Sequence, residues 1–454
     1  MNLTDNIKNV FFLGIGGIGM SALARFFKQE GKFVAGYDKT PSPLTKQLED
    51  EGIDVHYADD PENIPPEILG DKNSLIVYTP AIPDTNQEKA MFMQAPYRMM
   101  KRAQVLGVLG EKYQTLAVAG THGKTSISTM LAHLMQYGKD KAHAFLGGIS
   151  ANYKTNYIHA GQSPFMVVEA DEFDRSFLHL HPSASIISMV DADHLDIYGN
   201  KAGLENAFQK FAAQTDDLMI VRYDSILKTG PNRVFTYSLK DSRADFYASG
   251  MKKTGLCYDF DFHARDKVIS GFRMSVPGLL NVENMVAALA VAYLHDVKPE
   301  ELKQAVLDFR GIWRRFEIVY KDAERVYLDD YAHHPEEIRR TLETLKELFP
   351  GKRLTGVFQP HLYSRTKDFA PEFAKSLGLL DECILLPVYP ARELPIKGVS
   401  SELIAKYMKT KQPIMMEKED LPDYISENKP EVLITLGAGD IDRLTEPLKE
   451  RMSE

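Results

Sequence analysis

The chain has 454 residues, enough for about three domains. Its composition, 44% hydrophobic and 26% charged, is that of a globular protein, and its formal net charge of −9 argues against a nucleic-acid-binding protein with a basic face. The two cysteines are far apart in the sequence and fit no metal-binding pattern. The first residues lack the apolar core of a signal peptide, and no apolar run reaches the 18 residues of a membrane-spanning helix. We therefore expect a cytoplasmic protein without stable membrane insertion.

A Rossmann-type pattern opens the chain. An apolar strand is predicted over residues 9–13, and the sequence that follows fits G-x-G-x-x-G and leads into a helix; it consists of Gly14, Ile15, Gly16, Gly17, Ile18 and Gly19. A second strand, residues 33–37, ends at Asp38, about 20 residues beyond the glycines, where an acidic side chain can bind a ribose hydroxyl. The pattern predicts a diphosphate on the loop amides and is, by itself, weak evidence for NAD. Another strand over 74–79, and a restart of the pattern at Thr115, place a domain boundary shortly before Thr115.

A second glycine-rich loop lies between a predicted strand over 116–119 and a predicted helix whose apolar residues recur at i, i+3, i+4 and i+7 from Ile127. The loop comprises Gly120, Thr121, His122, Gly123, Lys124, Thr125 and Ser126. Loop amides and the positive helix end suit a phosphate; Lys124 would reach the outer phosphates of ATP, and the Thr125 hydroxyl would bind Mg²⁺. The loop has two residues between its first glycine and Gly-Lys, where the strict motif has four. A turn with a solvated lysine is therefore the alternative.

Carboxylates follow two more predicted strands, over 164–169 and 185–190. The first strand ends in Glu169, with Glu172 shortly after it, and the second leads to DADHLDIY, which contains His194. Ligands of open α/β sheets lie at the carboxyl ends of strands, so Glu169 and His194 are candidate metal ligands. The alternatives are a solvated acidic turn and a structural loop histidine.

Two further features precede the last third of the chain. A helix is predicted over 282–294 with Asn281 and Asn284 at its start, either as a helix cap or as amides that read an adenine edge. In the segment GIWRRFE, Arg315 suits the charge that develops on a transferred phosphoryl group, and a surface arginine pair is the alternative. A second domain boundary is predicted after this segment.

The last third again alternates strands and helices. Its predicted strands, each ending in polar or aromatic residues, cover 325–328, 354–358, 383–386 and 432–436. This pattern is typical of a doubly wound sheet with one binding edge. Candidates at that edge for positioning an amine or handling its proton are His333 and His361.

Together these features predict an ATP-dependent ligation. Two phosphate loops in separate domains require two phosphorylated ligands, and the second loop has the Lys-Thr pair and downstream acids that Mg-ATP requires. The economical chemistry moves a phosphoryl group from ATP to a carboxylate of the diphosphate-bearing substrate, while Lys124, Mg²⁺ and Arg315 neutralise charge. An amine held by the third domain then attacks the acyl phosphate.

Eight ordered motifs give the chain a full-length resemblance to the Mur ligase family. They are GIGGIGM (14–20), GTHGKTS (120–126), VEADEFDRSF (168–177), DADHLDIY (191–198), RRFE (314–317), DDYAHHP (329–335), FQPHLYSRT (358–366) and GAGD (437–440). The resemblance implies an α/β fold of three domains. These are a Rossmann-like UDP-sugar-binding domain (1–110), a P-loop-type central ATPase domain (111–319) and a Rossmann-like C-terminal domain that binds an amino acid (320–454).

The resemblance also implies the reaction, which joins L-alanine to the carboxylate of UDP-N-acetylmuramate and releases ADP and phosphate, as in peptidoglycan precursor synthesis. The UDP-sugar would lie on the first glycine loop and Asp38. Magnesium, or manganese, would be held by Thr125, Glu169 and His194. ATP would contact the second loop together with Lys124, Asn281, Asn284, Arg315 and Asp330, and the amino acid would lie beside His333, His361 and Arg365. The catalytic residues would be Lys124, His194, Arg315 and His361.

Three positions depart from the family pattern. Leu280 stands where the family usually has a histidine before the first adenine-binding asparagine, and Leu362 stands where an arginine often follows the histidine of FQPH. Sister ligases use a carbamylated lysine where this chain has Gln209, so that modification is not expected.

Other functions stay open from the sequence. A recycling ligase would attach a ready-made tripeptide to the same UDP-sugar. An NAD(P)-dependent oxidoreductase would use GIGGIG but leaves the second loop unexplained, and a non-catalytic nucleotide sensor would not need Lys124, Glu169 and His194. We expect small-molecule substrates, no nucleic acid, and a monomer or homodimer.

Overall fold

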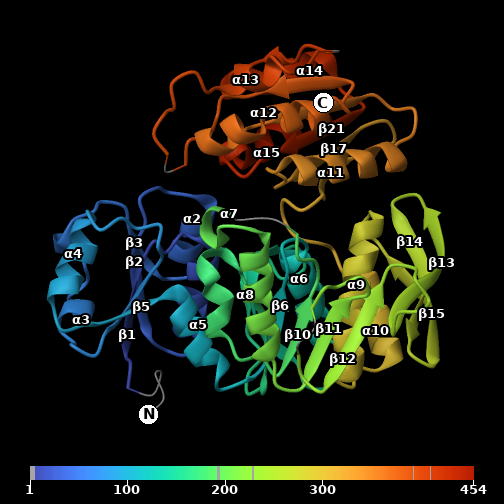
Figure 1. Ribbon diagram of the computed structural model, residues 1–454. Coiled ribbons are helices and arrows are strands. Elements are labelled where there is room, and N and C mark those ends of the chain that lie inside the picture. The colour runs from blue at the N-terminus through green and yellow to red at the C-terminus, as the bar shows by residue number, and fades with distance from the viewer. Residues whose placement is uncertain (1–5, 192–194, 228–229, 392, 410) are drawn as a thin grey trace. The chain divides into compact units, whose positions relative to one another are not determined.

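The computed structural model of the chain describes residues 6–191, 195–227, 230–391, 393–409 and 411–454 (Figure 1). By its internal contacts the chain divides into two units, one formed by Met1–Val276 with Leu280–Arg310 and the other by Pro277–Leu279 with Gly311–Glu454. The first unit contains two sheets and the second unit contains one. The chain is therefore an α/β protein of three domains, as predicted, and its first and last domains are Rossmann-like.

The N-terminal sheet is parallel and has the strand order β3-β2-β1-β4-β5. Its strands are β1 (Asn9–Leu13), β2 (Phe33–Tyr37), β3 (Asp54–His56), β4 (Leu75–Tyr78) and β5 (Arg98–Lys101), and its helices are α1 (Ile18–Gln29), α2 (Pro43–Asp50), α3 (Pro66–Leu69), α4 (Gln87–Gln94) and α5 (Arg102–Gly110). The predictions for β1 and β2 are confirmed. Because the strand order reverses between β1 and β4, the glycine loop after β1 lies at the switch point where such sheets bind ligands.

The central sheet has the order β15-β14-β13-β12-β11-β10-β6-β9-β7-β8. Its strands are β6 (Gln114–Ala119), β7 (Ala142–Ser150), β8 (Thr155–Ile158), β9 (Phe165–Glu169), β10 (Ala184–Ile187), β11 (Leu218–Arg222), β12 (Arg233–Ser238), β13 (Phe246–Thr254), β14 (Cys257–Ala264) and β15 (Lys267–Met274). The pairs β7–β8, β13–β14 and β14–β15 are antiparallel. The helices are α6 (Lys124–Met135), α7 (Leu195–Tyr198), α8 (Lys201–Ala213), α9 (Leu279–Leu294) and α10 (Pro299–Asp308), with a 3₁₀ segment η2 (Phe173–His179).

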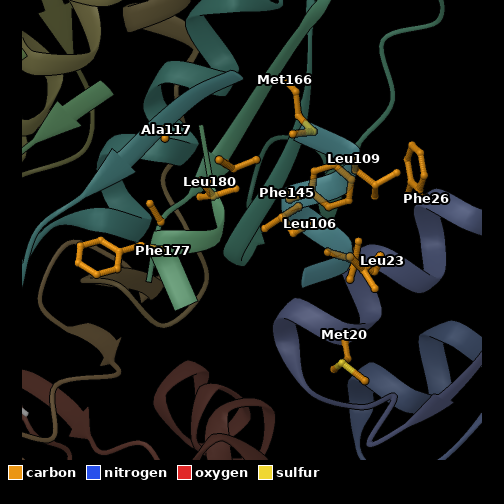
Figure 2. Close-up of a cluster of buried hydrophobic side chains, with 14 of the residues drawn as sticks. Met20, Leu23, Phe26, Leu106, Leu109, Ala117, Phe145, Met166, Phe177 and Leu180 are labelled. Atoms are coloured by element: carbon orange, nitrogen blue, oxygen red, sulfur yellow. The ribbon is translucent and has the colours of Figure 1, made fainter. Parts of the chain in front are cut away.

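The first two sheets share one hydrophobic core. Figure 2 shows Leu23 and Phe26 of α1 gathered with Leu106 of α5, Phe145 of β7 and Met166 of β9, all of which are buried. Phe26 lies 5.6 Å, ring to ring, from Phe145. The N-terminal and central domains are thus joined by packed apolar side chains, which hold their two phosphate loops within one unit.

The C-terminal sheet has the order β16-β17-β21-β18-β19-β20, with β16 antiparallel to β17 and the other pairs parallel. Its strands are β16 (Glu317–Lys321), β17 (Val326–Asp330), β18 (Leu354–Phe358), β19 (Glu382–Leu385), β20 (Ile414–Met415) and β21 (Val432–Leu436), and its helices are α11 (Pro335–Leu348), α12 (Tyr363–Leu377), α13 (Ser401–Ala405), α14 (Leu421–Asn428) and α15 (Thr445–Ser453). Helix α11 follows from its sequence, since proline occupies the first turn and Ile338, Leu342 and Leu345 form a buried stripe at helical spacing.

Several boundaries differ from the predictions. Strand β10 ends at Ile187 rather than at residue 190, and β17 continues to Asp330 rather than ending at residue 328. The β7–β8 hairpin was not predicted. None of the helices in the described ranges is long and apolar enough to cross a bilayer.

Candidate functional site

The glycine loop after β1 is held against the end of β2. The amides of Gly14 and Ile15 donate to the carbonyl oxygen of Tyr37 at 2.8 and 3.0 Å. The amide of Gly16 donates to Oδ2 of Asp38 at 2.8 Å. The structure therefore brings Asp38 onto the loop that was predicted to bind a diphosphate.

Two side chains that the sequence interpretation missed also line this loop. A Cβ added to Gly14, whose φ is +89°, would lie 2.8 Å from Cγ2 of Thr79, just beyond β4. A Cβ added to Gly19 would lie 2.6 Å from Nη1 of Arg102, at the start of α5. Both residues follow strands, and a prediction that took every strand end of this sheet into account would have included them.

The second glycine loop is fastened to the end of β10. The amide of Thr121 donates to the carbonyl oxygen of Met189 at 2.8 Å, and the hydroxyl of Ser188 donates to the carbonyl oxygen of His122 at 2.5 Å. Gly123 has φ +82° and directly precedes α6, so a side chain there would be strained. These bonds explain why β10 ends early, because residues 188–189 leave the strand to support the loop.

Lys124, the first residue of α6, forms a buried ion pair. Its Nζ donates to the carbonyl oxygen of Gly120 at 2.9 Å and lies 2.7 Å from Oε2 of Glu172. Burial alone would lower the pKa of Lys124, but the carboxylates of Glu172, Asp171 and Glu169 outweigh it and raise the pKa. Lys124 is therefore a fixed cation at the mouth of the loop, and Glu172 is a partner that the sequence interpretation had not assigned.

The carboxylate of Glu169 lies at the carboxyl end of β9, next to β6 in the sheet. A Cβ added to Gly147 would lie 2.5 Å from Cδ of Glu169, so only glycine leaves room for this carboxylate. Thr125 is buried in the first turn of α6. His194, the third predicted metal ligand, lies outside the described residues, and within the described ranges no three His, Cys, Asp or Glu side chains come together as a metal site.

The two asparagines of α9 differ in position. Asn284 is buried, and its Oδ1 lies 3.0 Å from the position of a Cβ on Gly123, so Asn284 packs against the second glycine loop. Asn281 lies inside α9, which begins at Leu279, so the capping interpretation of Asn281 is wrong. An adenine contact by either residue stays a prediction.

In the second unit, the two arginines of RRFE lie on the same aromatic ring. The guanidinium carbons of Arg314 and Arg315 lie 5.2 and 5.0 Å from the ring centroid of Tyr331. Arg314 also donates to the carbonyl oxygen of Gly437 at 2.5 Å and to Oδ2 of Asp329 at 3.2 Å. The contacts of Arg314 are thus made within the C-terminal domain itself. The side chain of Arg315 makes no hydrogen bond or ion pair with the described residues, so its guanidinium is available for a ligand.

Asp330 at the end of β17 is buried and accepts two backbone hydrogen bonds. Its Oδ2 accepts from the amide of Phe316 at 2.9 Å and its Oδ1 from the amide of Ala332 at 2.7 Å. Burial raises the pKa of Asp330 to about 6, although the charge of Arg315 opposes the shift. Asp330 thus ties the RRFE segment to the start of the DDYAHHP loop.

The predicted amino-acid residues lie at the carboxyl edge of the C-terminal sheet. The rings of His333 and His361 are 6.1 Å apart, and His361 stacks on Tyr389 at 5.8 Å. Burial lowers the pKa of His333 and the nearby charge of Arg365 lowers it further, while the carboxylate of Glu337 offsets part of the shift, so the neutral form of the imidazole is favoured. Nη1 of Arg365 is buried and has no hydrogen-bond partner among the described residues. This edge therefore offers an arginine donor, Nη1 of Arg365, near an imidazole whose neutral form is favoured.

Three family models match the chain in order. Residues 9–114 match the catalytic domain of the Mur ligase family, residues 118–292 the Mur ligase middle domain, and residues 314–439 the Mur ligase glutamate ligase domain. The chain belongs to the Mur ligase family.

Curated relatives narrow the comparison within the Mur ligases. A protein of Porphyromonas gingivalis named UDP-N-acetylmuramate–L-alanine ligase is 47% identical and aligns over 98% of this chain and 99% of its own length. A protein of the same name from Flavobacterium psychrophilum is 42% identical over the whole of both chains. The crystal structure of the UDP-N-acetylmuramate-alanine ligase of Thermotoga maritima superposes with a TM-score of 0.83 at 29% identity, covering 98% of this chain and 99% of that chain.

Proposed function

We propose that this Mur ligase joins L-alanine to UDP-N-acetylmuramate and converts ATP to ADP and phosphate in the same reaction. The observation that carries the proposal is the full-length similarity to relatives of that activity, at 41–47% identity. The second glycine loop, whose Lys124 pairs with Glu172 of another segment, supports the proposal, because an ATP-dependent ligase needs a cationic group beside the phosphates.

In the first step, a carboxylate oxygen of UDP-N-acetylmuramate attacks the γ-phosphorus of ATP, and the bond to the β–γ bridging oxygen breaks. ADP leaves and an acyl phosphate remains. Lys124 would hold the phosphates, and the guanidinium of Arg315 would stabilise the charge that spreads over the transferred group. The first glycine loop, with Asp38, would hold the diphosphate of the UDP-sugar.

In the second step, the amine of L-alanine attacks the acyl carbon and inorganic phosphate leaves. The amine reacts only after it loses a proton, and the neutral imidazole of His333 or the ring of His361 would accept it. Arg365 would bind the carboxylate of L-alanine, because a guanidinium whose buried Nη1 has no hydrogen-bond partner among the described residues suits a carboxylate.

Thr125 and Glu169, together with His194, would hold a magnesium ion. The fit rests on oxygen donors, which Mg²⁺ prefers, and on the space that Gly147 leaves around the Glu169 carboxylate. When bound, the ion would neutralise charge on the ATP phosphates. We also place the enzyme in the cytoplasm, because the proposed reaction consumes ATP.

The test is phosphate release from ATP with UDP-N-acetylmuramate and, in parallel, L-alanine, glycine, L-serine or the muramyl tripeptide. We expect release that requires both the UDP-sugar and L-alanine. Release with the tripeptide alone would assign the chain to peptide recycling. Absence of release with every amine would refute the proposal.

A further inference from the structure

Helix α1 of the N-terminal domain packs against β8, the edge strand of the central sheet. At this contact lies a small network of buried polar side chains, none of which belongs to a phosphate loop. Its central residue is Asn156 of β8, which is fully buried. Asn156 bonds to the side chains of Ser21 and Arg25 and to the backbone carbonyl oxygen of Ile18, all on α1.

Asn156 uses both ends of its amide on α1. Its Nδ2 donates to the carbonyl oxygen of Ile18 at 2.5 Å and to Oγ of Ser21 at 2.9 Å, and its Oδ1 accepts from Nη1 of Arg25 at 2.5 Å. Ile18 is the first residue of α1 and the penultimate residue of the glycine loop. Asn156 therefore fixes the point at which the UDP-sugar loop becomes a helix.

The opposite side of the hairpin reaches the ATP half of the site. Strand β7 pairs with β8 on one side and with β9 on the other, and β9 ends in Glu169. Register is lost between Phe145 and Ser150, and this irregular stretch contains Gly147, which packs on the Glu169 carboxylate. Three steps of strand pairing, about 14 Å at the usual spacing, separate β8 from the strand that leads into the Lys124 loop.

We propose that Asn156 is a positioning residue of the ligase reaction: through the β7–β8 hairpin it sets the UDP-sugar loop at a fixed distance from the ATP loop. This inference rests on the proposed function. Phosphoryl transfer needs the attacking oxygen about 3–3.5 Å from phosphorus, and a 1 Å displacement lowers rates by about 10²-fold. A buried asparagine fixes the distance between the two loops better than apolar packing alone. Its amide nitrogen donates and its amide oxygen accepts in defined directions, so both groups resist displacement.

The experiment isolates the first chemical step. Hydroxylamine replaces L-alanine, so that its nitrogen attacks the acyl phosphate, phosphate leaves, and a hydroxamate is measured. The variants are N156A and N156D. The aspartate keeps an oxygen for Arg25 but loses the donor to the carbonyl oxygen of Ile18, so it separates the two contacts.

Asn152→Ala is the matched control. Asn152 lies in the turn of the same hairpin, and its side chain donates to the carbonyl oxygen of Asp308 at 2.7 Å and accepts from the amide of Arg310 at 2.9 Å, both within the central domain's own chain segment. The Asn152→Ala substitution removes the same side-chain amide group but changes no contact with α1. Unfolding by urea measures the stability of every variant.

We expect N156A and N156D to form hydroxamate at least tenfold more slowly at saturating substrates and to raise the KM for UDP-N-acetylmuramate, with the Kd for an ATP analogue unchanged. N152A should stay within twofold of the wild type in rate even where its stability falls. A wild-type rate in N156D, or an equal loss of rate in N152A, would overturn the inference. A wild-type enzyme that forms no hydroxamate would instead refute the proposed function.

Discussion

The ion pair between Lys124 and Glu172 allows a quantitative prediction for Glu172→Gln. The two charges lie 2.7 Å apart, and their side chains are 13% and 0% exposed. Removing one partner of such a buried pair costs about 3–5 kcal/mol. Because glutamine keeps the shape, and because Asp171 and Glu169 still raise the pKa of Lys124, we expect the free energy of unfolding to fall by about 2–3 kcal/mol.

The assay is urea unfolding with and without a non-hydrolysable ATP analogue. The phosphates of the bound ATP analogue would supply the negative charge beside Lys124 that Glu172→Gln lacks. The difference in free energy of unfolding between the wild type and Glu172→Gln should therefore be smaller when the analogue is saturating. Glu205→Gln is the control, since the Lys201–Glu205 pair spans 3.6 Å between side chains that are 63% and 31% exposed, and its loss should change stability by no more than about 0.5 kcal/mol.

The two partners titrate in different pH ranges. The folded-state pKa of Lys124 lies above its ordinary value of 10.5, so the contribution of Lys124 is present below pH 10.5 and is lost as the pH rises through the folded-state pKa. Burial raises the pKa of Glu172 although the charge of Lys124 opposes the shift, so ionisation of this carboxyl costs stability as the pH rises above its ordinary pKa of 4.5. Equal stabilities of the Glu172→Gln and Glu205→Gln proteins at neutral pH would refute the reasoning. So would a loss that is the same with and without the ATP analogue.

Three more predictions follow from buried contacts. Gly147→Ala places a methyl group against the Glu169 carboxylate, so the Mg²⁺ concentration for half-maximal activity should rise at least tenfold; an unchanged value would remove Glu169 from the metal site. Arg365→Ala should raise the KM for L-alanine at least tenfold and leave that for ATP unchanged, and an unchanged alanine KM would place Arg365 outside the pocket. Burial lowers the pKa of His133 to about 4, so acidification from pH 7 to 5 should lower the free energy of unfolding by about 2 kcal/mol through this group. His133→Gln should reduce the pH dependence of stability by that amount. The same pH dependence in the variant and the wild type would contradict the prediction.

Both phosphate loops could be predicted because their signals are local. Glycines at fixed spacing between an apolar strand and an amphipathic helix specify the turn, and the structure has that turn at Gly14–Gly19 and at Gly120–Gly123. The strands at 9–13, 33–37, 354–358 and 432–436 were found for a similar reason, since short apolar runs between polar residues are typical of buried parallel strands.

Features that depend on distant residues could not be predicted. Glu172 meets Lys124 across 48 residues, and no pattern within either segment indicates the pairing. The β7–β8 hairpin mixes glycines with buried and polar residues, so period-2 alternation is absent. Its hydrogen bonds to α1 join residues that are more than a hundred positions apart. Similarly, β10 ends at Ile187 because Ser188 is needed by the loop of another strand.

The core shared by α1, α5 and the central sheet has a consequence for how the chain unfolds. A fragment ending near residue 110 would expose Phe26 and Leu106 to water, so the first domain should not be an independent folding unit. Calorimetry should therefore show one cooperative transition for the first two domains together and a separate one for the third. A sequence exchange between related ligases would then preserve folding only if the first two domains were exchanged as a single block.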